Sequence, residues 1–142
     1  MKATKFHTQT LLIVFASLFV AVTPWVTFAE ALSDSAPKGM STFVTSYIAE
    51  LGQRYHVDRK TLLAVISCES GGDMTAIGTL SKVGIDRGAL QVNDYYHGKK
   101  AKEMGFDLHR PSHSLEYGIY LMSKEGLKPW SASAKCVRKL LT

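Results

Sequence analysis

The stretch Ile66–Tyr96, ISCESGGDMTAIGTLSKVGIDRGALQVNDYY, is the segment from which we infer the fold of this 142-residue chain. It begins inside an apolar run, residues 62–67 (LLAVIS), whose composition predicts a helix buried on most sides. Two consecutive glycines at 71 and 72 end that helix. Residues 73–87, here called the wing, are polar and interrupted by two further glycines. They predict an irregular loop or a small β-hairpin beside the buried helix.

Two carboxylates of this stretch have unlike surroundings. Glu69 falls in the last turn of the buried helix, where burial and the negative end of the helix dipole both raise a carboxyl pKa. Asp86 lies in a polar, glycine-flanked context in which a carboxylate stays ionised. A carboxylic acid beside a carboxylate suits the cleavage of glycosidic bonds. The structural alternatives are a solvent-facing Glu69 and an Asp86 that only caps the next helix.

The segment after the wing carries candidate substrate-binding residues. An apolar pattern over residues 88–97 predicts a short helix, followed by a lysine-rich helix over 98–104. Gln91 and Asn93 can each donate and accept hydrogen bonds, which suits the hydroxyl and N-acetyl groups of an amino sugar, and Tyr95 joins them as a candidate. Either amide could instead clamp the backbone.

Two motifs in this order resemble those of a known family. Glu69-Ser70 followed by Gly88-Ala89-Leu90-Gln91-Val92-Asn93 is similar to the Glu-Ser and Gly-Leu-Met-Gln-Ile-Asn motifs of the lysozyme-like superfamily, especially bacterial soluble-lytic-transglycosylase (SLT) domains. Asp86-Arg87-Gly88 also resembles the Asp-x-Gly of animal-type lysozymes and of small transglycosylases associated with secretion systems. The similarity covers roughly residues 42–137.

The resemblance implies an all-α fold, α+β at most: a lysozyme-like helical domain with a small loop or β-hairpin wing. It also implies cleavage of the β-1,4 bond between N-acetylmuramic acid and N-acetylglucosamine in peptidoglycan, with Glu69 as the general acid and base and Ser70 among the substrate-binding residues. A lytic transglycosylase uses the sugar's own 6-hydroxyl, whereas a hydrolytic muramidase would use Glu69, Asp86 and water. A non-catalytic module that binds the cell wall or assists assembly is a third possibility. No metal or organic cofactor is implied.

The C-terminal third supplies two further candidates. Apolar spacing predicts a helix that ends at Gly126, and Tyr117 within it could reach the cleft or pack in the core. The family's Ala-Tyr-Asn-Ala-Gly motif is replaced here by residues 128–133 (KPWSAS), which puts the third wall of the cleft in question. Trp130 resembles the tryptophan that lysozyme relatives place near the acid, although a purely structural role is the alternative. Ser131 is the expected cap of a last helix.

The two cysteines, Cys68 and Cys136, both fall after the N-terminal apolar segment. An exported chain meets an oxidising compartment, where an even number of cysteines favours a bridge, so we predict that they pair. Two separate buried thiols are the alternative. No CxxC pattern occurs in the sequence, which disfavours a zinc site.

The N-terminus has the features of a signal peptide. Lys2 and Lys5 precede an apolar run, Leu11–Val22, and the small residue Ala29 suits signal-peptidase cleavage. We therefore predict a signal peptide over 1–29, a linker over 30–40 and a catalytic domain over 41–142. An uncleaved membrane anchor through residues 11–28 is the alternative. The expected location is outside the cytoplasm: periplasmic, cell-wall or extracellular.

The charge of the chain is mildly basic. Its 17 Lys and Arg against 12 Asp and Glu give a net charge of +5, which falls to +3 when residues 1–29 are removed. Such a balance favours anionic polymers, and peptidoglycan is one. The sequence has no run of five basic residues, so a nucleic-acid partner gains little support. We expect a monomer that binds peptidoglycan glycan strands and contacts a membrane only if the signal segment is uncleaved.

Overall fold

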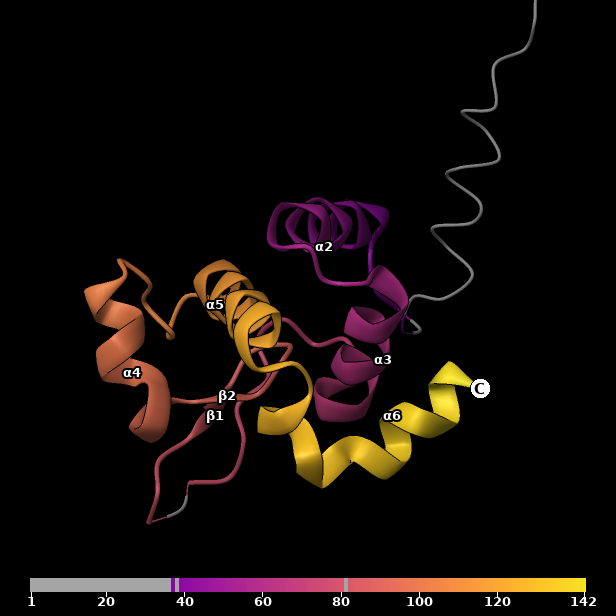
Figure 1. Ribbon diagram of the computed structural model, residues 1–142. Coiled ribbons are helices and arrows are strands. Elements are labelled where there is room, and N and C mark those ends of the chain that lie inside the picture. Colours follow the sequence, from indigo (N-terminus) through magenta and orange to yellow (C-terminus); the bar gives the residue numbers. More distant parts are fainter. Residues whose placement is uncertain (1–36, 38, 81) are drawn as a thin grey trace, which may run out of the picture.

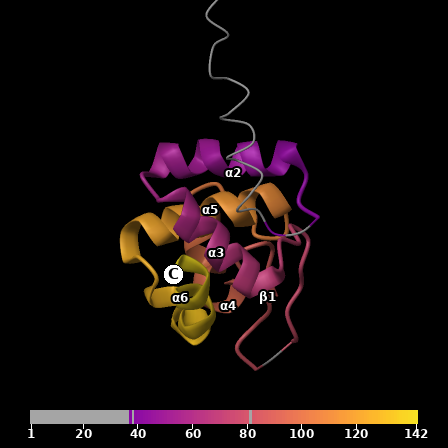
Figure 2. The ribbon, with the colours of Figure 1, turned by 90° about the vertical axis from the view of Figure 1, so that its right-hand side faces the viewer.

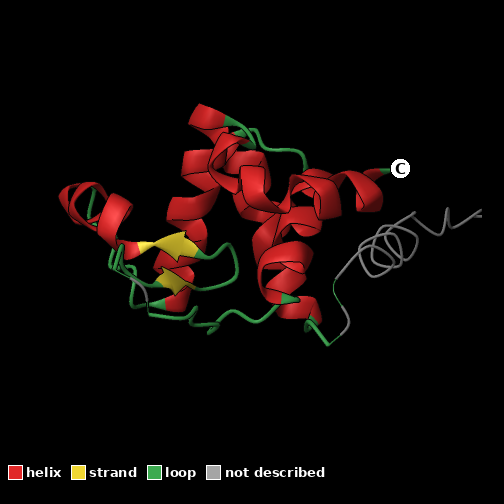
Figure 3. Ribbon diagram, turned by 90° about the horizontal axis from the view of Figure 1, so that it is seen from below, coloured by secondary structure: helices red, strands yellow, loops and turns green. Residues whose placement is uncertain are grey.

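The computed structural model describes residues 37, 39–80 and 82–142, so the predicted signal peptide and most of the predicted linker lie outside the described residues. The described part is helical with one small two-stranded antiparallel sheet, which confirms the predicted fold class (Figure 1; Figure 3). Within this part, no helix has the length and apolar character needed to cross a membrane. The elements are α2 (Thr42–Tyr55), α3 (Arg59–Ser70), β1 (Asp86–Arg87), β2 (Val92–Asn93), α4 (Asp94–Glu103), α5 (Pro111–Glu125), η1 (Lys128–Ser133) and α6 (Ala134–Leu141).

Helix α3 is the central element of the domain. It packs against α2, α6 and η1, and Figure 2 shows α2 lying across one end of this helical body. Its five consecutive residues 62–66 are buried, as the apolar run predicts. Asp58 caps its start by accepting a hydrogen bond from the Thr61 amide at 2.8 Å, and Gly71, with φ +64°, ends it. Both the start and the end of the helix that carries Glu69 are therefore fixed by local caps.

The prediction of a helix over residues 88–97 is wrong for residues 88–93 and confirmed for residues 94–97, which begin α4. Residues 88–91 form a turn between β1 and β2. The two strands pair antiparallel, with Asp86 of β1 opposite Asn93 of β2. Gly88 and Gln91 have φ values of +70° and +48°, which a right-handed helix does not permit. Asn93 then caps α4 by accepting hydrogen bonds from the amides of Tyr95 and Tyr96, so the helix starts at Asp94 and continues through position 98, where a boundary was predicted.

The turn at 88–91 is held by side chains from three helical elements. A buried backbone carbonyl needs a hydrogen-bond donor, and here four consecutive carbonyls each receive one from a side chain. The wing is thereby joined to α3, α5 and η1 through a single turn. The four bonds run from Ser114 Oγ to Arg87 O at 2.9 Å, Gln91 Nε2 to Gly88 O at 2.8 Å, Ser70 Oγ to Ala89 O at 2.9 Å, and Trp130 Nε1 to Leu90 O at 2.8 Å.

The C-terminal elements fold back onto α3. The predicted disulfide between Cys68 and Cys136 is present and joins α3 to α6, with the two Cα atoms 6.0 Å apart. The prediction that Ser131 caps the last helix is wrong, because the chain first makes the short helix η1 and α6 begins only after Ser133. Pro129 near the start of η1 fixes its backbone φ and so favours this separate turn.

Candidate active site

A cleft of about 300 Å³ lies where the end of α3, the hairpin, the first turns of α4 and η1 meet. Glu69 and Asp86, the two carboxylates singled out from the sequence, both line it. Larger hollows of about 600 Å³ lie beside α2 and beside α4, and other residues line them. The cleft residues are Glu69, Asp86, Gln91, Val92, Asn93, Tyr96, His97, Leu121, Pro129, Trp130 and Ala132.

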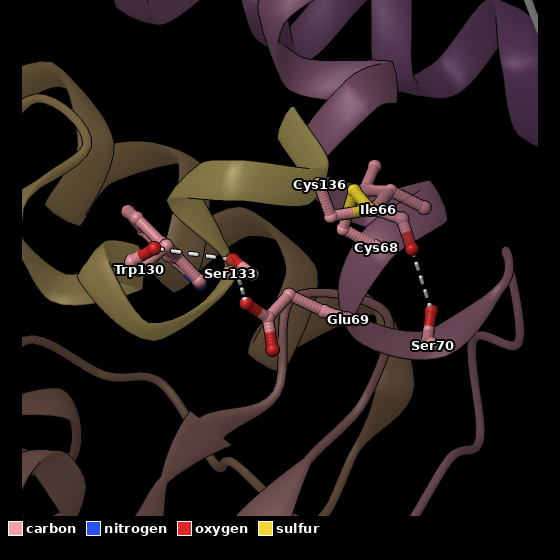
Figure 4. Close-up of a disulfide and its surroundings, with 7 residues drawn as sticks. All are labelled: Ile66, Cys68, Glu69, Ser70, Trp130, Ser133 and Cys136. Atoms are coloured by element: carbon pink, nitrogen blue, oxygen red, sulfur yellow. Dashed lines mark hydrogen bonds between the residues drawn. A yellow bond between two sulfur atoms is a disulfide. The ribbon is translucent and has the colours of Figure 1, made fainter. Parts of the chain in front are cut away.

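Glu69 is half-buried at the end of α3. Burial is the main cause that raises the pKa of its carboxyl group, and the negative charge of Asp86 raises it further. A hydrogen bond from the Ser133 hydroxyl, with 2.6 Å between Oγ and Oε1, acts in the opposite direction (Figure 4). Because burial has the largest effect, Glu69 keeps its proton to higher pH than an ordinary glutamate and can act as an acid.

Asp86 faces the same cleft from strand β1. Its Oδ1 accepts a hydrogen bond from Asn93 Nδ2 at 2.9 Å, across the register that pairs these two residues. The hairpin itself is closed by an ion pair between Arg87 Nε and Asp94 Oδ2 at 2.8 Å. Asp86 therefore sits on a fixed strand in a polar environment, opposite a half-buried acid.

Three of the predicted substrate-binding residues line the cleft: Gln91, Asn93 and Trp130. Each also bonds within the protein. Gln91 Nε2 and Trp130 Nε1 donate to carbonyls of the turn. Asn93 donates to Asp86 and accepts from the amides at the start of α4. Their polar groups thus serve first to fix the cleft wall, and what they offer a ligand is the surface that faces the cleft.

The other three predicted residues lie away from the cleft. Ser70 donates to Ala89 O in the turn and accepts from the Gly72 amide. Tyr95 is 68% exposed and stacks edge-on against Tyr96. Tyr117 is 1% exposed and packs among aromatic rings of the core, which matches the alternative stated for it above.

Three residues with polar side chains at the site, Tyr96, His97 and Ser133, were not predicted from the sequence. Tyr96 and His97 line the cleft from the first turn of α4, and burial lowers the pKa of His97, which favours its neutral form. Ser133 contacts Glu69 directly. A signal for Ser133 was available, because it stands three residues before Cys136 and the predicted bridge joins Cys136 to the neighbour of Glu69. In the part of the chain that the structure describes, no group of three or more His, Cys, Asp or Glu side chains could hold a metal ion.

A helical domain whose cleft sets a half-buried acid at a helix end opposite a carboxylate on a hairpin is a lysozyme-like domain. The family model for the transglycosylase SLT domain matches residues 46–130, more than half of the chain, and the chain belongs to this family. The match ends at Trp130, so Ser133 and Cys136 lie beyond it.

Two curated proteins are similar to the chain. Protein IpgF of Shigella flexneri is 30% identical over 77 residues, which are 51% of this chain and 50% of that protein. Protein IpgF of Shigella sonnei is similar to the same extent. The chain thus spans about half the length of the curated relatives that it matches. No solved structure matches the chain significantly.

Proposed function

We propose that this protein is a peptidoglycan lytic transglycosylase that cleaves the β-1,4 bond between N-acetylmuramic acid and N-acetylglucosamine. The observation that carries the proposal is Glu69: in a domain of the SLT family, a cleft-lining carboxyl group has a pKa raised by burial. A carboxyl group that keeps its proton to higher pH than an ordinary glutamate is suited to protonate and expel a sugar leaving group.

The reaction needs one group that first gives and then takes a proton. The Glu69 O–H donates its proton to the glycosidic oxygen as the bond between that oxygen and the anomeric carbon breaks. The resulting Glu69 carboxylate then accepts the proton of the muramic acid 6-hydroxyl as that oxygen bonds to the anomeric carbon. Glu69 returns to its protonated form and the product carries a 1,6-anhydro ring, so no water is consumed.

A hydrolytic muramidase is the second candidate, and Asp86 is the observation that favours it. Asp86 lines the same cleft and its charge acts on Glu69, as a second carboxylate in a retaining hydrolase must. In a transglycosylase Asp86 would have a lesser role. A non-catalytic wall-binding module would not need an acid with a raised pKa, so it is the weakest of the three.

The remaining assignments follow from the cleft and the composition. Gln91, Asn93 and Trp130 present their cleft-facing surfaces to the glycan, and the indole of Trp130 both excludes water and offers a face to a sugar ring. The mildly basic chain suits an anionic cell-wall polymer. Such a substrate lies outside the cytoplasm, in agreement with the signal peptide predicted for residues 1–29. We propose that the protein acts there as a monomer.

The test uses purified peptidoglycan and three proteins: wild type, Glu69→Gln and Asp86→Asn. Glu69→Gln keeps the shape but removes the proton, so cleavage should fall by about 10²- to 10⁴-fold. Asp86→Asn should keep a substantial part of the activity, and mass spectrometry should find 1,6-anhydro ends. Products with reducing ends, together with an Asp86→Asn protein as inactive as Glu69→Gln, would identify a hydrolase instead. A folded Glu69→Gln protein of near wild-type rate would refute the role of Glu69.

A further inference from the structure

Ser133 occupies a position between Glu69 and the backbone of η1. Its Oγ lies 2.6 Å from Glu69 Oε1 and 3.1 Å from the carbonyl oxygen of Trp130, and Figure 4 shows the side chain between these two oxygens. As the residue before α6, Ser133 would be expected to cap that helix, but its hydroxyl is directed at the acid instead.

The two contacts of Ser133 use one hydroxyl proton. A serine hydroxyl donates once and accepts through two lone pairs, so it donates to only one of the two oxygens at a time. When Glu69 is ionised, the hydroxyl donates to Oε1. When Glu69 carries its proton on Oε2, the oxygen that does not contact Ser133, the hydroxyl still donates to Oε1. When the proton is on Oε1, the carboxyl group donates to Oγ and the hydroxyl turns to donate to the Trp130 carbonyl. Ser133 is thus a hydrogen-bond partner for either form of Glu69 and keeps its own proton in both.

We infer that Ser133 is a positioning residue that holds Glu69 in one orientation through both proton transfers, by turning its hydroxyl between Oε1 and the Trp130 carbonyl. The inference rests on the proposed role of Glu69 as the acid and base. It concerns a residue beyond the part of the chain that matches the SLT family model, which ends at Trp130.

The support of Ser133 is rigid on both sides. Three residues after it, Cys136 is bridged to Cys68, the residue before Glu69, so the disulfide ties together the two chain segments that carry Ser133 and Glu69. Three residues before it, Trp130 is buried and its indole donates to Leu90 O at 2.8 Å. A side chain whose own support is fixed can hold a reacting group within the small tolerance that catalysis requires.

Removal of the hydroxyl should have two separate effects. The ionised form of Glu69 loses a hydrogen-bond donor, so the pKa of Glu69 should rise further above its ordinary value. Turnover should also slow, because the acid loses its fixed orientation and its carboxylate form is less stabilised between the two proton transfers. The loss of one hydrogen bond to a charged group corresponds to about a 10- to 100-fold fall in kcat.

The experiment compares wild type with Ser133→Ala, Ser133→Thr and Ser131→Ala. Ser133→Thr keeps a hydroxyl, and Ser131 is an exposed serine of the same short helix that serves as the matched control. The Glu69 carboxyl is titrated by NMR in protein with ¹³C-labelled glutamate side chains, and its signal is assigned by its absence from Glu69→Gln. Rates on peptidoglycan are measured over the same pH range.

Ser133→Ala alone should show a higher Glu69 titration midpoint and a lower kcat, with little change in KM. Ser133→Thr should stay close to wild type. A Ser133→Ala protein with the wild-type midpoint would overturn it, as would an equal shift in Ser131→Ala. An inactive wild-type protein would contradict the proposed function alone, because the titration of Glu69 would still decide whether Ser133 acts on it.

Discussion

Reduction of the Cys68–Cys136 bridge should destabilise the domain strongly. The two cysteines are 68 residues apart in the sequence. A bridge restricts the unfolded chain, by about 3 kcal/mol for 15 enclosed residues and about 4.7 kcal/mol for 100, so this one should contribute about 4 kcal/mol. Since small domains are stable by only about 5–15 kcal/mol, the reduced protein should lie near the limit of stability.

Urea unfolding followed by circular dichroism measures this effect without changing the sequence. With a urea dependence of about 2 kcal/mol per molar, the midpoint should fall by about 2 M when the reductant is present. Intact mass confirms reduction, and a Cys68→Ala/Cys136→Ala double variant, whose midpoint should not respond to reductant, is the control. A reduced protein with an unchanged midpoint would show that the bridge does not restrict the unfolded chain as calculated.

Three further predictions concern the turn and the acid. Trp130→Phe removes the donor to Leu90 O and leaves a buried carbonyl without its partner, so the free energy of unfolding should fall by about 1–3 kcal/mol in urea titrations, and no fall would argue against this bond. Gly88→Ala adds backbone strain at φ +70° and places a Cβ 2.8 Å from Ser114 Oγ. The control Gly105→Ala, at φ +86° and with open space for its Cβ among the described residues, adds backbone strain alone. Gly88→Ala should therefore lower the melting temperature more than Gly105→Ala, and equal losses would contradict the close contact. Because the pKa of Glu69 is raised in the folded protein, its ionisation opposes folding as pH rises through that pKa. Glu69→Gln should therefore be more stable than wild type at neutral pH and should lose this advantage at pH values below the pKa of an ordinary glutamate. A pH-independent difference in the free energy of unfolding would refute the assigned burial.

The parts of the fold that repeat a simple pattern could be predicted from the sequence. The apolar run of α3, its cap at Asp58 and its end at Gly71 all follow from local chemistry. The bridge follows from an even number of cysteines in a chain that is predicted to be exported. The turn at 88–91 could not be predicted in the same way. Its apolar residues suit a helix, and only the backbone conformation of Gln91, with φ +48°, and donors distant in sequence show that it is a turn.

The sequence identified several residues of the candidate site correctly, but not always what their side chains do there. Glu69 and Asp86 were found because carboxylates in unlike surroundings have a chemical meaning, and both line the cleft. Ser70 and Trp130 were selected as substrate contacts, yet their donors bond to the backbone of the turn. A hydroxyl or an indole N–H serves either purpose equally well, and its direction depends on tertiary packing that local spacing does not encode.

The bridge also determines what a protease can do to this protein. The wing carries exposed apolar residues, among them Ile77, Leu80 and Val83, in the segment where cleavage is easiest. A single cut there falls between Cys68 and Cys136, so the two pieces stay attached to each other through sulfur. The nicked molecule would gain only the mass of one water molecule, and a reductant would then separate the fragment with Glu69 from the fragment with Ser133.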